Sequence, residues 1–388
     1  MTVLQVIPAL ETGGAERTVL EVGAAVVAAG GRSLVASEGG GMVAQLEAEG
    51  SQHFTLPVAS KNPLVMWKNR RALMEIIEKE GGSLIHARSR APAWSALWAA
   101  KATDIPFVTT YHGIYNAKSE AKRLYNSVMA RGDRVIANSA YTAETVKAAY
   151  GHAPFFDAGR LTVIPRGADL SRFNPSRLDE ARKSTVVQAF GGQGVYRILL
   201  PGRLTDWKGQ RVLIKAAGLL QRDSDIPPFR IVLVGSAQGR DGYEAELRAQ
   251  METDGVNDLV HIHGHWEDMP AAYDWADVTL STSTRPEAFG RVAVEAQAMG
   301  CPVIATNHGG ALETVDPGNT GLLVPPGDEK ALAEALKTMM GMAQSEKEAM
   351  ATAAQERIKA HFSTETMTAA TISVYKEVLT HCRGALTT

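Results

Sequence analysis

A chain of 388 residues, 45% hydrophobic and 21% charged, is too long for a single small core and too apolar for a disordered or fibrous protein. At about 100 to 200 residues per domain, this length predicts two domains. The 40 Lys and Arg residues nearly balance the 42 Asp and Glu residues, and the net charge of −2 argues against a protein that coats nucleic acid.

The cysteines and the N-terminus bear on location. Cys301 and Cys382 stand far apart without a second ligand pair, so they predict neither a disulfide framework nor a zinc knuckle, and they favour a reducing compartment. The N-terminal apolar stretch is interrupted at Pro8 and Glu11 before it resembles a signal sequence. No stretch reaches the roughly 18 to 20 apolar residues of a membrane span. We expect a cytoplasmic protein, with at most peripheral contact at the inner face of the cytoplasmic membrane.

Strand and helix patterns alternate along the first half of the chain. In order, they predict a strand at 3–7, a helix at 18–29, a strand at 33–36, a helix at 66–80, a strand at 84–86, a helix at 94–102, a strand at 107–110, a helix at 122–130, a strand at 135–138, a helix at 142–150 and a strand at 161–164. This alternation is typical of βαβ units, which build a parallel sheet.

A stretch rich in Gly and Pro follows, and then a second alternating series begins. It predicts a strand at 197–200, a helix at 212–220, a strand at 231–234, a helix at 243–253, strands at 260–263 and 278–281, a helix at 292–299, a strand at 303–305, a helix at 331–340 and a helical segment over 350–379 that breaks before Ser363. We therefore predict an α/β protein of two Rossmann-like, doubly wound domains that face a cleft between them. The expected divisions are an N-terminal domain at 1–168, an interdomain passage at 169–195, a C-terminal domain at 196–362, and a C-terminal helix at 363–388 that packs back on the first domain.

A glycine turn is the first candidate for anion binding. Gly13 and Gly14 follow the first strand and open the first helix, where free backbone N–H groups and the helix dipole attract an anion. The spacing is not G-x-G-x-x-G, which disfavours a nicotinamide dehydrogenase. The glycines alone favour an ordinary strand-to-helix turn, so an anion-binding role needs further anion-binding residues elsewhere in the chain.

Two cations on a later strand-to-helix loop supply such residues. Arg203 and Lys208 lie five residues apart, directly after the strand at 197–200. A guanidinium that binds in a fork and a point-charge ammonium suit a diphosphate, and the carboxyl edge of a parallel sheet is where ligands bind. The alternative is a pair of solvated loop cations.

A pair of carboxylates forms the most specific pattern. Glu287 falls on the loop after the strand at 278–281, and Glu295 falls just over one turn into the following helix. Paired carboxylates accept hydrogen bonds from vicinal hydroxyls, which a sugar and a ribose both present. Two glutamates with this E-x7-E spacing are common on helices. Here the first lies on a loop and the second on the following helix, after the loop that carries the two cations, and this placement favours a ligand-binding role.

At this point the chain resembles the retaining glycosyltransferases of family 4, of the two-Rossmann-domain GT-B type, over nearly its whole length. The matching segments are Gly13-Gly14-Ala15-Glu16-Arg17, Thr110-Tyr111-His112-Gly113, Pro165-Arg166-Gly167-Ala168-Asp169, Gly202-Arg203 with Lys208-Gly209, and Glu287-Ala288-Phe289-Gly290 through Glu295. Arg166 stands where many relatives have Asn. Similar enzymes include bacterial transferases of lipopolysaccharide and envelope polysaccharide.

The resemblance implies a role for each matching residue. The catalytic set would be His112, Glu287, Arg203 and Lys208, with His112 contacting the transferred sugar, Glu287 holding the donor sugar and Glu295 holding the ribose. The donor-binding set would be Gly13, Gly14, Gly202, Arg203, Lys208, Gly235, His265, Glu287, Ala288, Phe289, Gly290 and Glu295. The first domain would bind the acceptor and the second the nucleotide sugar. Without the resemblance, a histidine at a strand end is more often structural or solvated.

Charge is unevenly distributed. Residues 61–134 contain 13 basic and six acidic residues, a net of +7 that the remainder balances with −9. Basic residues interleaved with apolar ones suit an anionic bilayer or an anionic acceptor, and equally a solvated helix face over a core. The candidates for this surface are Lys61, Lys68, Arg70, Arg71, Arg88 and Arg90.

Two other patterns suggest metal binding and are rejected. Asp223 and Asp225 form a D-x-D string in a polar turn, where a solvated turn is the better interpretation. His261, His263 and His265 share one strand face, but no nearby carboxylate or cysteine completes a zinc site, and an edge of a nucleotide-base pocket fits better. We expect no metal and no cofactor.

The sequence therefore predicts a metal-independent, retaining hexosyltransferase. The expected partners are a UDP- or GDP-linked sugar and a glycan or lipid-linked acceptor such as lipopolysaccharide core, with contact to an anionic membrane and none to nucleic acid. Two alternatives stay open, namely a sugar-nucleotide epimerase on the same fold and a non-catalytic protein that binds nucleotide sugars.

Overall fold

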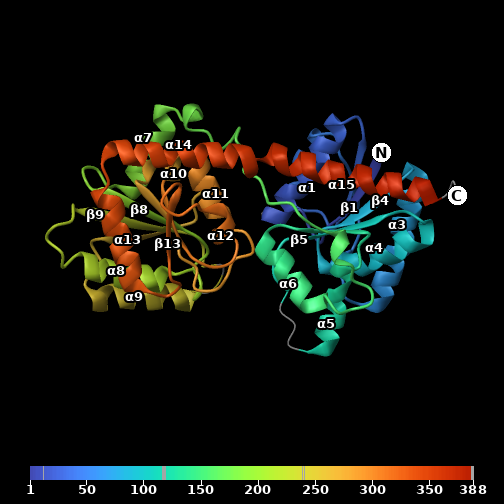
Figure 1. Cartoon of the computed structure of the whole chain (residues 1–388), viewed down its shortest axis with the longest axis horizontal. Coiled ribbons are helices and arrows are strands. Elements are labelled where there is room, and N and C mark those ends of the chain that lie inside the picture. Colours follow the sequence, from blue (N-terminus) through green and yellow to red (C-terminus); the bar gives the residue numbers. More distant parts are fainter. Residues whose placement is uncertain (12, 116–118, 238, 240, 386–388) are drawn as a thin grey trace. The chain divides into compact units, whose positions relative to one another are not determined.

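The structure is a computed structural model of the chain and describes residues 1–11, 13–115, 119–237, 239 and 241–385. The chain divides into two compact units. Unit 1 comprises Met1–Arg166 together with Thr364–Thr388, and unit 2 comprises Gly167–Ser363. Each unit is built on its own sheet (Figure 1).

Unit 1 contains a seven-stranded parallel sheet in the order β3-β2-β1-β4-β5-β6-β7. Its strands are β1 (Thr2–Val6), β2 (Arg32–Ser37), β3 (Gln52–Thr55), β4 (Leu84–Ala87), β5 (Phe107–Tyr111), β6 (Arg134–Ala137) and β7 (Leu161–Val163). Every residue of β1, β4 and β5 is buried. Such continuous burial is expected where helices cover both faces of a parallel sheet, so these strands form the centre of the unit.

The helices of unit 1 cover the two faces of its sheet. They are α1 (Gly14–Ala28), α2 (Val43–Ala48), α3 (Pro63–Glu80), α4 (Arg90–Thr103), α5 (Glu120–Asn126), α6 (Ala140–Tyr150) and the C-terminal α15 (Thr364–Ala385), with 3-10 turns at Ser127–Ala130 and Ala158–Arg160. The side chain of Asn62 caps the start of α3, and Gly81 ends that helix at a φ of 67°. Helix α15 packs on α1, and the pair shares a buried cluster with β1 (Figure 1).

Unit 2 contains a six-stranded parallel sheet in the order β10-β9-β8-β11-β12-β13. Its strands are β8 (Tyr196–Pro201), β9 (Phe229–Val234), β10 (Val260–Gly264), β11 (Val278–Ser281), β12 (Val303–Thr306) and β13 (Gly321–Val324). Its helices are α7 (Glu180–Phe190), α8 (Gln210–Leu220), α9 (Asp241–Asp254), α10 (Met269–Trp275), α11 (Arg291–Ala298), α12 (Ala311–Thr314), α13 (Glu329–Gly341) and α14 (Gln344–His361), with a 3-10 turn at Pro175–Arg177. Both units are therefore doubly wound α/β folds, which confirms the predicted class.

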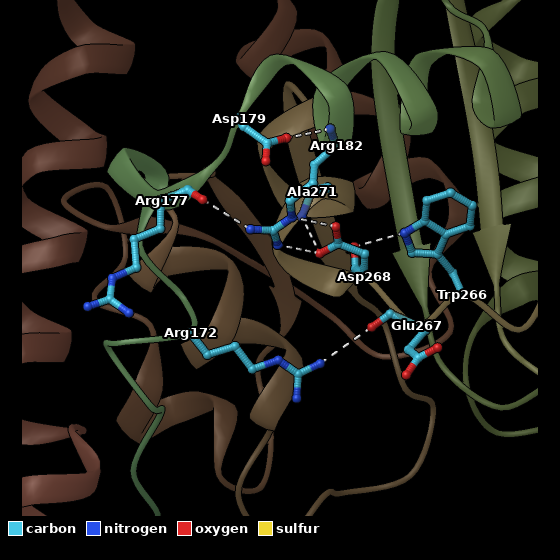
Figure 2. Close-up of polar contacts among 8 residues, drawn as sticks. All are labelled: Arg172, Arg177, Asp179, Arg182, Trp266, Glu267, Asp268 and Ala271. Carbon is cyan, nitrogen blue, oxygen red and sulfur yellow. Dashed lines mark hydrogen bonds and ion pairs between the residues drawn. The ribbon is translucent and has the colours of Figure 1, made fainter.

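The segment 169–195, expected to be a passage between domains, instead belongs to unit 2. It contains α7, which buries Val186 and Phe190 in the core of that unit. Figure 2 shows the polar contacts that attach it: Arg182 donates from Nε and Nη2 to the two carboxylate oxygens of Asp268, at 2.8 and 2.6 Å. The Gly and Pro residues that suggested a linker shape turns within a packed segment.

Every predicted strand and helix has a counterpart, and several further elements escaped the sequence patterns. The unpredicted elements are α2, β3, α7, α10, α12 and β13. Strand β3 is a four-residue edge strand with no buried residue, so no apolar pattern marks it. The helix predicted at 122–130 divides into α5 and a 3-10 turn.

Candidate functional site

The cation and the carboxylate expected in unit 2 contact each other at the carboxyl edge of its sheet. Lys208, on the loop after β8, donates from Nζ to Glu287 Oε1 at 2.7 Å. Glu287 lies on the loop after β11, and its Oε1 also accepts a hydrogen bond from the Ser283 hydroxyl. Residues 79 apart in sequence are thus brought together where parallel α/β sheets bind ligands.

Close backbone approaches shape this edge. A Cβ on Gly235, at the end of β9, would lie 1.9 Å from the carbonyl oxygen of Gly202 at the end of β8. The backbone carbonyl of Glu287 accepts a hydrogen bond from Gly310 N at 2.9 Å, and a Cβ on Gly309 would lie 2.5 Å from the same oxygen. The glycines are therefore required for the loops to pack this closely. The roles of Ser283, Gly309 and Gly310 were not predicted.

Arg203 is exposed beside a hollow of about 350 Å³. The hollow is lined by Arg203, Thr205, Asp206, Trp207, Tyr243 and Arg285. The Thr205 hydroxyl is buried there without a hydrogen-bond partner, and no ion pair among the described residues involves Arg203. A guanidinium and a hydroxyl left available at the same edge suit an anionic oxygen ligand.

The second carboxylate, Glu295 on α11, is 9% exposed and has partners of its own. Its Oε1 accepts from Arg291 Nη2 at 2.5 Å, and its Oε2 accepts from Tyr273 Oη at 3.0 Å. Burial, and then the charge of Glu295, raise the pKa of Tyr273 well above its ordinary value, which keeps this hydroxyl a donor. Each carboxylate oxygen has a second lone pair, so Glu295 can accept a further hydroxyl.

Between the two carboxylates, the chain turns into α11. The Phe289 side chain packs on Phe362 in the core of unit 2, with ring centroids 5.9 Å apart, so only its backbone remains for a ligand. Gly290 caps α11 at a φ of 90°. The start of α11 carries the partial positive charge of the helix dipole, which favours an anion.

The residues of the two metal-like patterns can be placed in the described part of the chain. No group of three or more His, Cys, Asp or Glu side chains gathers there as a metal site. Asp223 pairs with Lys337 at 2.6 Å, as a structural turn would. His263 packs edge to face on Phe190 and Trp266, whereas His265, after β10, is exposed.

In unit 1, His112 follows the end of β5. Both ring nitrogens are buried and have no hydrogen-bond partner. Burial lowers the pKa of His112 well below its ordinary value, and the charges of Arg166 and Arg88 lower it further. Arg166 Nη2 lies 3.4 Å from the His112 carbonyl oxygen. The imidazole is therefore neutral at pH 7 and keeps both a donor and an acceptor for a ligand.

The glycine turn of unit 1 opens a helix as expected. Gly13 is extended and caps α1, which begins at Gly14. A Cβ on Gly13 would lie 2.1 Å from Glu16 Oε2, so a carboxylate already packs against this turn. Acidic groups are favourable at a helix N-terminus for the same reason that a phosphate is.

The basic candidates in 61–134 do not form one surface. Three of them are exposed on or beside α3, namely Lys61, Lys68 and Arg71. The guanidinium carbon of Arg70 lies 4.6 Å from the ring centroid of Trp67. Arg88 contradicts the expectation: it is 2% exposed and binds Gln5 in the interior of unit 1, so it contacts neither membrane nor solvent.

Arg90 is also directed inward. It donates to Asn126 Oδ1 at 2.9 Å and lies 4.1 Å from the ring centroid of Tyr115. Lys118 lies outside the described residues. A basic count along the sequence does not distinguish solvated cations from those that the fold buries at a strand end.

Two family models match the chain. Residues 191–357 match "Glycosyl transferases group 1", and residues 12–172 match "Glycosyltransferase Family 4". A D-inositol 3-phosphate glycosyltransferase of Xylanimonas cellulosilytica is 31% identical over 296 residues, which is 72% of this chain and 68% of that protein. The chain spans about half to two thirds of the length of the curated relatives it matches.

Two solved structures resemble the chain over nearly its whole length. A glycosyltransferase of Rickettsia africae ESF-5 is 33% identical, with a TM-score of 0.89, and the match covers 97% of this chain and 98% of the other. Anabaena Alr3699/HepE in complex with UDP-glucose is 26% identical, with a TM-score of 0.80, and the match covers 96% and 99% of the two chains.

Proposed function

The chain belongs to glycosyltransferase family 4, of the GT-B fold, and from this membership we propose that it transfers a hexose from a nucleoside-diphosphate sugar to a glycan or glycolipid acceptor, with retention of anomeric configuration. The observation that carries this proposal is the contact of Lys208 with Glu287 at the carboxyl edge of the unit 2 sheet, on the same loop after β8 that carries Arg203. One carboxylate for sugar hydroxyls and two cations for a diphosphate are the groups that such a donor requires.

The donor base is proposed to be uracil or guanine. The similarity to a structure that contains UDP-glucose supports uracil. A thermal-shift panel of UDP, GDP, ADP and TDP tests the choice, because a ligand that binds only the folded protein raises its melting temperature. A shift for UDP or GDP well above the other three supports the proposal, and equal shifts for all four contradict it.

In the proposed mechanism, the leaving diphosphate acquires charge that Arg203, Lys208 and the first amides of α11 stabilise. The acceptor hydroxyl attacks from the face that the diphosphate leaves and gives its proton to the leaving phosphate. These side chains supply the positive charge, so we propose that transfer needs no metal. Turnover that persists in excess EDTA supports this point, and turnover that EDTA abolishes and Mg²⁺ restores contradicts it.

The acceptor is proposed to be envelope glycan or lipid-linked glycan, such as lipopolysaccharide core, reached at an anionic membrane surface through α3. Leu64 is 74% exposed and Trp67 is 47% exposed, with Lys68 and Arg71 exposed beside them. Apolar side chains among cations are the composition of a helix that lies at an anionic interface. Trp67 also borders a hollow of about 410 Å³ with Arg70 and Trp98. Among the described residues, no helix has both the length and the hydropathy to cross a bilayer.

Vesicle sedimentation tests this surface. The unmodified protein should sediment with vesicles that contain phosphatidylglycerol more than with pure phosphatidylcholine, and Leu64→Glu with Trp67→Glu should remove the difference. Leu219→Glu, at a 36% exposed leucine of unit 2, is the matched control. Equal sedimentation of all three proteins would contradict the membrane proposal and leave the transferase proposal unaffected.

Product analysis separates the transferase from its two alternatives. An epimerase converts the nucleotide sugar to an isomer without an acceptor, and a sensor binds the donor and leaves it unchanged. Transfer of labelled sugar to an envelope extract, with release of the nucleoside diphosphate, supports the proposal. An isomerised donor in an acceptor-free reaction would instead support the epimerase.

A further inference from the structure

The C-terminal helix places the polar side chain of Tyr375 in the interior of unit 1. Tyr375 on α15 is fully buried, and its Oη lies 2.6 Å from Nδ1 of His86, which is itself fully buried in β4. The two rings meet edge to face, with centroids 5.6 Å apart. A buried hydroxyl costs free energy unless its hydrogen bonds are made, so its partners determine where it lies.

Arg88, directly after β4, is 2% exposed, and its charge acts on both His86 and Tyr375. Its Nε and Nη2 donate to Gln5 Oε1, at 2.9 and 2.5 Å. No salt bridge among the described residues includes Arg88. Burial lowers the pKa of Arg88, and the charge of Glu21 on α1 opposes that shift. A buried guanidinium is costly unless its hydrogen bonds are made, so the two bonds to Gln5 help to stabilise this strand end.

His86 connects Tyr375 to β5 through its two ring nitrogens. Burial lowers the pKa of His86 well below its ordinary value, so the neutral ring donates through one nitrogen and accepts through the other. Its Nε2 lies 2.8 Å from Thr110 Oγ1. Thr110 is the penultimate residue of β5, two positions before His112. A continuous polar chain therefore connects α15 to the end of the strand that carries His112.

We propose that Tyr375 is a positioning residue for His112, acting through His86 and Thr110 on the end of β5. The inference rests on the proposed function, in which His112 contacts the transferred sugar. His112 makes no ring hydrogen bond of its own, so the strand end that precedes it is what holds the imidazole in place. Small misplacements of a contacting group are known to cost up to about 100-fold in rate.

Tyr375→Phe tests the proposal because it keeps the ring and removes the hydroxyl. The turnover number for UDP release from UDP-glucose, or GDP release from GDP-mannose, should fall about 10-fold per folded molecule, while the Kd of UDP or GDP should not change. Tyr150→Phe is the matched control: Tyr150 is also buried in unit 1, at 6% exposure, and its hydroxyl donates to the Arg123 carbonyl at 3.1 Å, outside the chain of Tyr375, His86 and Thr110. Its turnover should stay within about twofold of the unmodified protein.

A double-mutant cycle separates positioning from general stability. In a His112→Ala background, Tyr375→Phe should cause no further loss of turnover, because residues that act through one group are not additive. Thr110→Val should reduce the turnover number as Tyr375→Phe does, and it replaces Tyr375→Phe in the experiment if that variant does not fold. Unchanged turnover in a folded Tyr375→Phe or Thr110→Val protein would overturn the proposal, as would a full additional loss in the His112→Ala background.

Imidazole ¹⁵N spectra give a readout that does not depend on turnover. The His86 resonances should move in Tyr375→Phe, because that variant loses the hydrogen bond at Nδ1. The His112 resonances should move in Tyr375→Phe and Thr110→Val but not in Tyr150→Phe. Moved resonances in a protein that turns over no donor would contradict only the proposed function. Unmoved His112 resonances in a protein whose turnover depends on Glu287 would contradict only the positioning role.

Discussion

Lys208 Nζ and Glu287 Oε1 lie 2.7 Å apart, so the cation expected to bind the diphosphate and the carboxylate expected to hold the sugar are a single ion pair. Both side chains are mostly buried, at 14% and 23% exposure. Removing one partner of a mostly buried pair leaves the other charge uncompensated. The pair orients both groups before a donor arrives.

Glu287→Ala should therefore reduce turnover by at least about 100-fold, near 3 kcal/mol of transition-state stabilisation. Binding of the nucleoside diphosphate should persist, because Lys208 loses only its competing carboxylate. Steady-state kinetics with UDP or GDP titrations measure both quantities. Ser283→Ala removes one hydrogen bond to the same carboxylate and should cost much less. Near-normal transfer by Glu287→Ala would refute the assignment.

Arg203→Ala should weaken binding of the nucleoside diphosphate by about 10- to 100-fold, since a guanidinium bound in a fork to phosphate contributes charge and geometry together. Arg203→Lys should recover only part of the affinity, and the loss should shrink as salt is raised. Arg222→Ala, at an exposed turn, serves as the control in the same titration. Unaltered affinity in Arg203→Ala would show that the diphosphate lies elsewhere.

Gly235→Ala should destabilise unit 2 and impair donor binding together. The new Cβ would lie 1.9 Å from the Gly202 oxygen, so the ends of β8 and β9 must separate. We expect a cost of about 1 to 3 kcal/mol, as for overpacked sites. Gly242→Ala, where a Cβ meets nothing within 4 Å, should cost little. Urea unfolding and UDP titration of both variants measure the two effects. An unchanged free energy of unfolding and an unchanged UDP affinity in Gly235→Ala would contradict this prediction.

The pairing of Arg182 with Asp268 makes part of the stability of unit 2 dependent on pH. The hydrogen bonds from Arg182 lower the pKa of Asp268 below its ordinary value of 3.8. Because the folded pKa is the lower one, the contribution is complete above the unfolded value and disappears as pH falls through the folded value. After discounting for partial exposure, it amounts to about 1 kcal/mol.

Asp268→Asn should accordingly lower the melting temperature at pH 7, and the difference from the unmodified protein should narrow below about pH 4. Glu246→Gln, which breaks the more exposed pair with Arg211, should have almost no effect at either pH. A melting difference for Asp268→Asn that is the same at pH 3 and pH 7 would show that the ion pair is not its source.

Arg166→Asn should raise the pKa of His112, because it removes a positive charge that disfavours the imidazolium. The pKa should remain below the ordinary 6.5, since burial is the larger cause and Arg88, with the neutral His86 nearby, still faces the ring. Imidazole NMR titration measures the shift. A lower or unmoved His112 pKa in this variant would contradict the electrostatic account.

Much of the fold was predictable because strands and helices of α/β units carry strong local patterns. Short, weakly apolar elements such as β3 were not, since an edge strand buries too little to need an apolar run. The segment 169–195 was misassigned for a related reason: its Gly and Pro residues mark turns equally well in a linker and in a packed segment. The burial of Val186 and Phe190 and the pairing of Arg182 with Asp268 distinguish the two (Figure 2).

The length of 388 residues and the alternating strand and helix patterns by themselves predicted two α/β domains, and they placed Arg203, Lys208 and Glu287 on loops after predicted strands and Glu295 on the following helix, because strand ends and loop positions follow from local periodicity. Only the tertiary structure decided that Arg88 is buried on Gln5 and that Tyr375 reaches His86 from 289 residues away. Burial and long-range hydrogen bonds depend on which strands become neighbours, and residue types and their spacing along one chain carry no record of that.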